Sequence, residues 1–569
     1  MKKDNIPPFE SWPVRYPNKK TVIAKISSFV EGMKKASTGE EAYKVWKQSA
    51  KYSDKIYTQI SHISVLYSIN TQDKKLIKLQ KKMNQDMPEI EAVSKEFSKA
   101  VLASPHREYL EKKLGSFYFQ MAENALKGFS EAIIPEMIKE SELTMQYGAL
   151  IASAKIEFRG ETYNLSQMGK FMEDLDRNTR KEAAEAYYGF LSGIKDQLED
   201  IYDQLVKVRD TMAKKLGYKS YTELGYINMQ RYDYTPEEVA AYREAIRESV
   251  TPLAGKIAKA KLKRVGIKKP QVYDMGLAFK DGNPAPLGST ADKVANAQKM
   301  YDQISEETSY FFNLMVKTGV LDLEAKPGKQ SGGYMTFFPT YKIPFIFSNF
   351  NGTSGDVDVL THEFGHSFQY CMSRDIKIPE YRMPTMEACE IDSMSMEFFA
   401  EPYMDLFFDD PVKYRYLHLA DSISFLPYGV TVDEFQHWVY ENPNATPAER
   451  DAKWHELEVK YTPYKVEAYG DCEYMATGHR WLTQGHIFSS PFYYIDYTLA
   501  QVMAFQFFNL DRKNHEKAWK KYVKLCKMGG KYPFRTLIAK AGLKDPFKEG
   551  VVKSTIKPLV KQLNSYNVD

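Results

Sequence analysis

The sequence predicts a mainly α-helical protein with one small β-sheet, and three observations support this. The chain has 569 residues, of which 43% are hydrophobic and 14% aromatic, enough apolar material for more than one core. Apolar and charged residues recur at helical spacing over long stretches. Only two short stretches, 154–164 and 332–352, change to patterns typical of strands. From the length alone we expect two or more lobes.

The first part of the chain predicts a series of helices and one hairpin. From about residue 21 to residue 150 few helix breakers interrupt the pattern. The expected breaks between helices are three prolines, Pro88, Pro105 and Pro135. Residues 154–164 then alternate on either side of Arg159-Gly160, which predicts a small β-hairpin.

After the hairpin the helical pattern resumes. We expect one long charged helix, capped by Ser166 and ending near Gly217. Thr235-Pro236-Glu237-Glu238 combines an N-cap, a proline at the first helical position and a capping-box glutamate, which predicts a helix running to about Lys256. Another long helix is predicted over 290–318. Two aromatic strands, 334–338 and 344–350, then precede a further helix.

Composition excludes several classes of function. Lys and Arg total 78 against 74 Asp and Glu, and this near balance argues against a nucleic-acid-binding protein. No stretch approaches 18 continuous apolar residues, so we expect no membrane span. The first twenty residues carry no apolar run typical of a signal peptide. The four cysteines follow no metal or redox pattern, which predicts free thiols and a cytoplasmic location.

The strongest motif is His362-Glu363-Phe364-Gly365-His366, the only H-E-x-x-H in a chain with 10 histidines. Four residues are about one helical turn, so the two imidazoles project side by side and can share one metal ion. Glu363 lies beside them, angled towards a water on that ion. The alternative to a metal site is that the two histidines of such a helix are simply exposed to solvent or packed in a core. Gly365 weakens a helix, which predicts that another segment passes close to the backbone there.

A catalytic zinc needs a third protein ligand, and the helix predicted over 385–400 offers four carboxylates. They are Glu387, Glu390, Asp392 and Glu397, and spacing alone does not choose between them. No histidine follows the motif at the spacing of H-E-x-x-H-x-x-G-x-x-H, which favours a carboxylate ligand. Asp358 stands one turn before His362, so we expect it to accept the second N–H of that imidazole.

These motifs together resemble the thimet-oligopeptidase class of zinc metallopeptidases, in particular its oligoendopeptidase F and Pz-peptidase branch. The resemblance rests on HEFGH followed by E-x-x-S-x-x-x-E at Glu390–Glu397, and it extends over most of the chain through IEFRGETYNLSQM, KKLGYKSYTELGY, PFIFSNFNGTSGDVDVLTHEFGH and VDEFQHWVYENPNATPAER. It implies that Glu390 is the third ligand of one Zn²⁺ per chain and that Glu397 supports the ligands. Asp392 departs from the pattern, which has a small or neutral residue before the serine.

The same resemblance implies substrate-side groups within 485–503. Tyr497 and His486 would stabilise the oxyanion of the tetrahedral intermediate, because a phenol or imidazole beside the metal can donate to it. Tyr494 and His486 resemble residues that contact substrate. Tyr493 is a weaker candidate, since such aromatic residues also serve as core.

The strand before the motif helix offers a further contact. We expect the segment around Asn349 to bind substrate by adding it as an extra strand.

The resemblance implies a two-lobed helical body that encloses a deep channel, with an N-terminal lobe over 1–205 and a catalytic lobe over 206–569. The expected function is zinc-dependent cleavage of internal bonds in short unstructured peptides. The alternatives are a zinc carboxypeptidase or dipeptidyl carboxypeptidase, in which Arg480 could hold the terminal carboxylate, and a non-catalytic peptide-binding protein. Neither the oligomeric state nor the role of Cys389, which adjoins Glu390, follows from the sequence.

Overall fold

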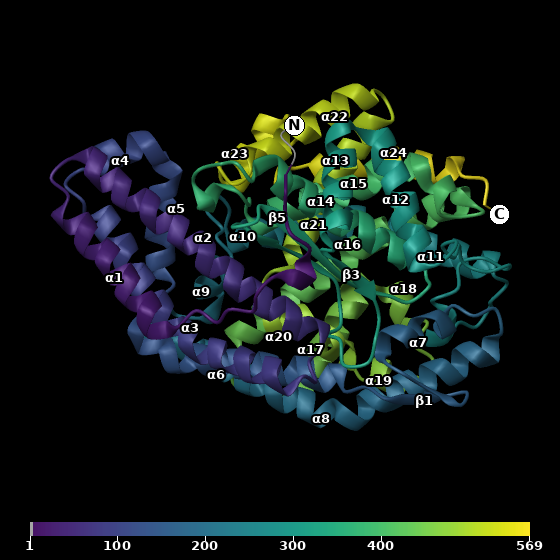
Figure 1. Ribbon diagram of the computed structural model, residues 1–569. Coiled ribbons are helices and arrows are strands. Elements are labelled where there is room, and N and C mark those ends of the chain that lie inside the picture. The colour runs from purple at the N-terminus through teal and green to yellow at the C-terminus, as the bar shows by residue number, and fades with distance from the viewer. Residues whose placement is uncertain (1–3, 569) are drawn as a thin grey trace.

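The computed structural model describes residues 4–568 and confirms a mainly helical fold with two small sheets (Figure 1). The helices of the first part of the chain are η1 (Phe9–Ser11), α1 (Lys19–Lys35), α2 (Gly39–Ile69), α3 (Lys74–Leu102), α4 (Arg107–Leu114), α5 (Ser116–Lys127), η2 (Glu131–Ile133), α6 (Ile134–Ala152), α7 (Leu165–Met172) and α8 (Arg177–Lys215). Among the described residues, no helix is both long and apolar enough to span a membrane.

The remaining helices belong to the second part of the chain, in which α14 carries the predicted motif. They are α9 (Tyr221–Asn228), α10 (Pro236–Ser249), α11 (Thr251–Arg264), η3 (Val272–Asp274), α12 (Thr290–Ile304), α13 (Glu306–Thr318), α14 (Gly355–Ser373), η4 (Pro379–Tyr381), α15 (Met386–Ala400), η5 (Glu401–Leu406), α16 (Pro411–Glu441), α17 (Pro447–Tyr461), α18 (Pro463–Val466), α19 (Glu473–Ala476), η6 (His479–Thr483), α20 (Gly485–Ser489), α21 (Tyr494–Asp511), α22 (His515–Met528), α23 (Phe534–Ala541) and α24 (Val551–Ser565).

The N-terminal helices form an end of the molecule with a core of its own. Helices α1 to α5 gather at the left of Figure 1, while α6 and α8 run along its lower edge. Side chains such as Phe29, Trp46 and Phe119 fill the space between α1, α2 and α5. The lobe boundary near residue 205 stays a prediction.

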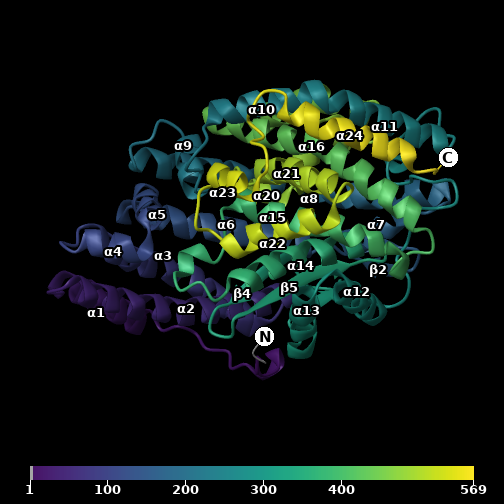
Figure 2. The same ribbon diagram turned by 90° about the horizontal axis from the view of Figure 1, so that it is seen from above.

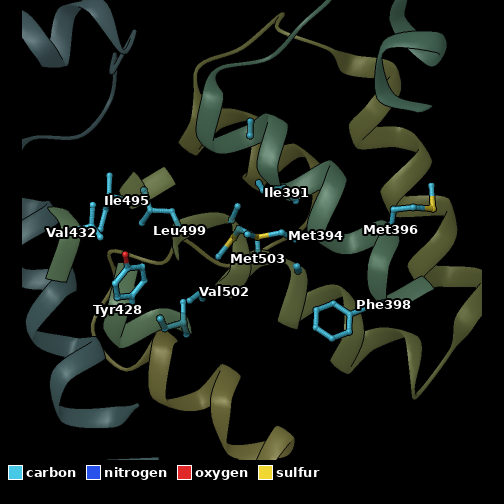
Figure 3. Close-up of a cluster of buried hydrophobic side chains, with 14 of the residues drawn as sticks. Ile391, Met394, Met396, Phe398, Tyr428, Val432, Ile495, Leu499, Val502 and Met503 are labelled. Carbon is cyan, nitrogen blue, oxygen red and sulfur yellow. The ribbon is translucent and has the colours of Figure 1, made fainter. Parts of the chain in front are cut away.

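The main core is built on α15, α16 and α21. Figure 3 shows Ile391 and Met394 of α15 beside Leu499 and Met503 of α21, with Val432 of α16 at the same cluster. Between Glu387 and Ala400 every residue of α15 is buried except Glu397. A helix that is covered on almost all sides carries no amphipathic stripe, and its polar residues therefore lie inside the protein.

The predicted hairpin and sheet are both present. Strands β1 (Ile156–Phe158) and β2 (Glu161–Tyr163) pair antiparallel around Arg159-Gly160. The larger sheet has the order β3-β5-β4, with β3 (Leu321–Glu324) parallel and β4 (Tyr334–Phe338) antiparallel to the central β5 (Ile343–Phe350). The sequence analysis missed β3. Figure 2 shows β4 and β5 beside α14, which packs on this sheet.

Three helix predictions were wrong at internal breaks. The helix expected from Ser166 to Gly217 is two helices, α7 and α8, and Ser166 lies inside α7. Asn164 caps α7 with a capping box, and the carboxylate of Asp176 accepts backbone N–H groups at the start of α8. Each side chain satisfies donors that a new helix leaves unpaired, which favours a restart over a continuous helix.

The other two breaks follow the same logic. The capping box at Thr235 is confirmed, but α10 ends at Ser249, and Pro252 in the first turn of α11 cannot donate a backbone N–H. The helix expected over 290–318 is interrupted at Ser305, which is extended and caps α13. Pro88 does not separate helices as expected, since it lies within α3.

Candidate metal centre and active site

The motif residues lie on α14, whose opposite face is buried as predicted. This face is formed by Val357, Leu360, Phe364 and Phe368, which have no exposed surface. The helix cap expected over 353–356 takes another form. Ser354 makes no capping hydrogen bond, and the carboxylate of Asp356 instead accepts from the backbone N–H groups of Asn351 and Gly352.

Helices α14 and α15 cross at Gly365. A Cβ atom at this position would lie 2.5 Å from Cα of Ser393 and 2.7 Å from the carbonyl oxygen of Asp392. No side chain fits at such distances, so the predicted close approach of another backbone is confirmed. The crossing brings the carboxylate of Glu390 on α15 to the histidines of α14.

We expect Gly365→Ala to lower the free energy of unfolding by about 3 kcal/mol, because the added methyl group forces the two helices apart. Gly193→Ala is the matched control, since Gly193 also lies within a helix but a Cβ there meets nothing within 4 Å. That change should raise stability by up to about 1 kcal/mol. Urea unfolding of both variants measures the difference, and equal stabilities would contradict the close crossing.

Three potential metal ligands converge at this crossing. Nε2 of His362 lies 3.1 Å from Oε2 of Glu390, and Nε2 of His366 lies 3.4 Å from the same oxygen. All three ligand atoms lie within 4.8 Å of one another. Two imidazoles and one carboxylate are a donor set typical of a catalytic zinc site, so these residues fit the metal that the sequence analysis expected.

The charges at the crossing favour an ionised carboxylate. Burial acts to raise the pKa of Glu390, but the neighbouring His366 and His362 outweigh it and hold this pKa well below its usual range. The hydroxyl of Ser393 donates to Oε2 of Glu390 at 3.0 Å, and the phenol of Tyr493 donates to Oε1. Every oxygen of this buried carboxylate therefore has a partner that fixes its orientation.

Glu397 connects two histidines behind the three ligand atoms. Its Oε1 lies 2.7 Å from Nδ1 of His362, and its Oε2 lies 2.7 Å from Nε2 of His418 on α16. The predicted contact between Asp358 and His362 is wrong, because Asp358 accepts a hydrogen bond from Tyr414 instead. Nδ1 of His362 points towards α15, where Glu397 meets it. No signal in the sequence indicated His418.

Glu363 is a buried carboxylate with one free oxygen. Its side chain is 6% exposed, and Oε2 has no hydrogen-bond partner among the described residues. Burial raises the pKa of this carboxyl. A Cβ atom on Gly333, just before β4, would lie 3.5 Å from Oε1 of Glu363. The start of β4 therefore passes directly over the carboxylate.

A chain of hydrogen bonds leads from Tyr497 into the protein. Oη of Tyr497 lies 3.1 Å from Nε2 of His486, and Nδ1 of His486 lies 2.9 Å from the amide nitrogen of Gln484. The amide oxygen of Gln484 accepts from the phenol of Tyr428 at 2.7 Å. The sequence analysis missed Gln484 and Tyr428, and Tyr428 lies on α16, far away in the chain.

This chain of bonds determines where His486 carries its proton. Because Tyr428 donates to the amide oxygen, Gln484 presents its N–H₂ group to Nδ1 of His486. Burial lowers the pKa of His486, which favours the neutral ring. The ring proton therefore sits on Nε2 and points at Tyr497. Burial also raises the pKa of Tyr497 well above its usual value, so that its phenol keeps a proton to donate.

Open space adjoins these side chains. A cavity of about 320 Å³ is bordered by Glu397, His486, Tyr494, Tyr497 and neighbouring residues of α16 and α21. The ring of Tyr494 lies edge-on to His486, with 5.2 Å between the ring centroids. The structure thus brings together His486, Tyr494 and Tyr497 on the open side of the ligand cluster, with Tyr493 bonded to Glu390.

The substrate contact expected at Asn349 stays a prediction. Asn349 lies on the central strand β5, two residues beyond Phe347, at which the pairing with β4 stops. Its side-chain amide donates to the carbonyl oxygens of Gln330 and Gly332, at 2.8 Å each. Asn349 therefore holds the loop that leads into β4. Strand β4 lies at the edge of the sheet and is the strand at which another could be added.

Asp392 and Cys389 point away from the ligand cluster. The carboxyl of Asp392 accepts from the thiol of Cys526 at 3.4 Å, and burial raises its pKa well above the usual value. The thiol of Cys389 contacts the carbonyl oxygen of Pro384 at 3.4 Å, and burial raises its pKa as well. Neither residue meets the histidines, so the departure at Asp392 leaves the three-residue cluster intact.

Arg480 does not lie beside Glu363. It belongs to η6, and its guanidinium group stacks on the ring of Tyr428 with 4.6 Å to the centroid. The ring of Tyr428 in turn contacts Tyr494, which borders the cavity.

Comparison with known proteins places this arrangement among peptidases. Residues 170–555 match the model of peptidase family M3, and residues 9–129 match the model of the peptidase M3 N-terminal domain. The chain is 43% identical to a solved structure described as Pz peptidase A with an inhibitor. The two superpose with a TM-score of 0.97 over 98% of this chain and 99% of the other.

Curated relatives are more distant. The chain is 22% identical over 66% of its length to oligopeptidase PepF of Bacillus subtilis (strain 168). It is 23% identical over 69% of its length to an oligoendopeptidase F homolog of Borreliella burgdorferi. The match spans 55% and 65%, respectively, of the length of these two relatives.

Proposed function

This chain belongs to peptidase family M3, and from that premise we propose that it is a zinc-dependent endopeptidase acting on internal bonds of short, unstructured peptides. The observation that carries the proposal is the convergence of His362, His366 and Glu390 beside the buried carboxylate of Glu363. A non-catalytic peptide-binding protein would not need a carboxylate held at this position without a partner.

His362, His366 and Glu390 would hold one zinc ion. When bound, zinc supplies Lewis-acid polarisation of the scissile carbonyl and lowers the pKa of water towards about 7. Glu397 supports this site by holding the ring of His362 in one orientation through Nδ1.

Glu363 is the proton carrier of the proposed reaction. Its unpaired Oε2 can accept a proton from the attacking water and then deliver it to the leaving amine. Burial raises the pKa of this carboxyl, which makes it a stronger proton acceptor than a solvent-exposed carboxylate.

Tyr497 is the proposed donor to the oxyanion of the tetrahedral intermediate. Its oxygen accepts from Nε2 of His486, which leaves the phenolic proton free for the substrate. We expect Tyr497→Phe to lower kcat about 10²- to 10³-fold with a small change in KM, as for loss of one oxyanion donor. Steady-state kinetics with zinc-loaded protein measures this. An unchanged kcat would remove Tyr497 from the chemistry.

Gln484 is proposed to set the tautomer of His486. We expect Gln484→Glu to lower kcat at neutral pH, because a carboxylate accepts from Nδ1–H and leaves Nε2 to take the proton of Tyr497. The imidazolium form donates from both nitrogens, so the activity of this variant relative to wild type should recover as the pH falls. Gln484→Met should lose activity without that recovery. Parallel pH profiles for wild type and Gln484→Glu would contradict the assignment.

Substrate is proposed to lie along the edge of β4. The start of this strand passes over Glu363, and an extended peptide paired with it would present its backbone to the catalytic carboxylate. A cavity of about 420 Å³ lies between α2, α3 and α6 on one side and Gln330 and Ser489 on the other. We propose that it belongs to a channel between the N-terminal and catalytic parts, which would exclude folded proteins.

Fragment analysis tests the endopeptidase activity against the alternatives. A peptide of about ten residues, blocked at both ends, should be cut at an internal bond, and mass spectrometry should detect the two resulting fragments. A carboxypeptidase or dipeptidyl carboxypeptidase would leave it intact, and a binding protein would retain it uncleaved. The cytoplasmic location, expected from free cysteines, stays a prediction, as does the absence of nucleic-acid partners.

A further inference from the structure

Two cationic side chains share one aromatic ring near the cavity. The guanidinium carbon of Arg480 lies 4.6 Å from the ring centroid of Tyr428, and the ammonium group of Lys465 lies 5.3 Å from the same centroid. Arg480 comes from η6, Lys465 from α18 and Tyr428 from α16. Three separate elements thus bring the two half-buried cations to the same aromatic ring.

Neither cation makes a direct ion pair with a carboxylate of the described residues. Within residues 4–568, every carboxylate oxygen lies more than 4.0 Å from the charged nitrogens of Arg480 and Lys465, too far for an ion pair. In addition, Nε of Arg480 is buried and has no hydrogen-bond acceptor among these residues. The nearby Glu458 receives the phenol of Tyr469 at 2.6 Å instead. Burial and the charge of Arg480 lower the pKa of Lys465 to about 7. Glu458 and Asp421 attract Lys465, and Glu458 attracts Arg480, from beyond ion-pair distance. Half-buried cations without a direct ion pair are costly, which favours a site for an external anion.

The pair lies close to the proposed active site. The ring of Tyr428 meets that of Tyr494 edge-on at 5.8 Å, and Tyr494 in turn lies 5.2 Å from His486. Two aromatic contacts therefore separate the cations from His486. An extended peptide rises about 3.4 Å per residue, so a few residues cover this span.

We propose that Arg480 and Lys465 form a subsite for a carboxylate of the peptide substrate, foremost its C-terminal carboxylate. The guanidinium fork binds a carboxylate through two parallel hydrogen bonds, and the ammonium group adds a third donor. Because the subsite lies a few residues of extended chain from His486, an anchored C-terminus aligns an internal bond for cleavage. This inference rests on the proposed peptidase function and adds a rule for choosing the bond.

Three versions of one peptide test the subsite. The first has a free C-terminus, the second a C-terminal amide, and the third an amide with glutamate as the last residue. Zinc-loaded wild type should cleave the free acid with a kcat/KM about tenfold above that of the amide, mostly through KM. Arg480→Gln should bring this ratio close to one, and Lys465→Met should reduce it in the same direction.

Arg264→Gln is the matched control. Its guanidinium group also stacks on a tyrosine of α16, at 4.6 Å from the ring of Tyr416, but it donates to the carbonyl oxygen of Ala278. This variant should keep the wild-type ratio. The glutamate peptide identifies the source of the anion: cleavage equal to the free acid shows that any carboxylate at this place is bound. Cleavage equal to the plain amide shows that the C-terminus is required.

Three results would overturn the inference. Wild type could cleave the acid and the amide equally, or Arg480→Gln could keep the preference; in both cases the peptidase function itself would stand. Cleavage of none of the peptides would remove the proposed function and the subsite with it. If Arg480→Gln does not fold, inhibition of wild type by uncleaved product peptides decides, since the free acid should inhibit about tenfold more strongly than the amide.

Discussion

Glu390→Ala is expected to abolish both zinc binding and peptide cleavage. The change removes one of three ligand atoms that lie within 4.8 Å of one another and leaves two imidazoles to hold the ion. We expect the zinc content after dialysis to fall from about one per chain to less than about a tenth, and kcat/KM to fall at least about 10³-fold. Metal analysis and kinetics on the same samples measure both effects.

Two other carboxylates of α15 are the controls for this prediction. Asp392 accepts from Cys526, and Glu387 is buried without a hydrogen-bond partner, away from the histidines. Asp392→Asn and Glu387→Gln should therefore keep the zinc. If either variant lost the metal while Glu390→Ala retained it, the choice of the third ligand would be wrong.

Glu363→Gln is expected to leave the metal in place and remove the chemistry. The amide has nearly the same shape as the carboxylate but cannot accept and return a proton, so kcat should fall about 10³- to 10⁴-fold. Zinc content should stay at about one per chain. The wild-type carboxylate is buried with one oxygen unpaired, so the neutral side chain should keep or raise the melting temperature.

Measuring kcat together with the zinc content and the melting temperature distinguishes a catalytic role of Glu363 from a structural one. A variant that loses activity together with zinc or thermal stability would show that Glu363 supports the site structurally. A variant with near wild-type kcat would exclude it as the proton carrier.

The proposed metal ligands differ in how far the sequence could predict them. One turn of helix places His362 and His366 side by side wherever the helix lies, so their spacing was sufficient. The third ligand depends on how α15 crosses α14, which local spacing does not contain. Four carboxylates therefore remained possible until the resemblance to a known family selected Glu390, and the crossing at Gly365 explains that choice physically.

Contacts between distant elements were the main omission. Asp358 was expected to support His362 because both lie on one helix stripe, but the ring nitrogen points to Glu397 on another helix. His418, Gln484 and Tyr428 act through hydrogen bonds to residues far away in the sequence or on other elements. The short parallel strand β3 was missed because four residues that pair only through tertiary structure leave no pattern of their own.

Helix existence was easier to predict than helix ends. The long periodic stretches were all helical, whereas the breaks at Asp176 and Ser305 are made by single capping side chains within otherwise helical sequence. The burial of α15 on almost all sides explains why its carboxylates had no polar face to mark them.

Zinc titration of the metal-free protein tests the central claim most directly. Chelator-treated protein would be mixed with increasing zinc and assayed on an internally quenched peptide of about ten residues, blocked at both ends. The proposed site predicts no cleavage without metal and a linear gain in internal cleavage that reaches its maximum at one equivalent per chain. Full cleavage by metal-free protein, or none at one equivalent of zinc, would contradict it.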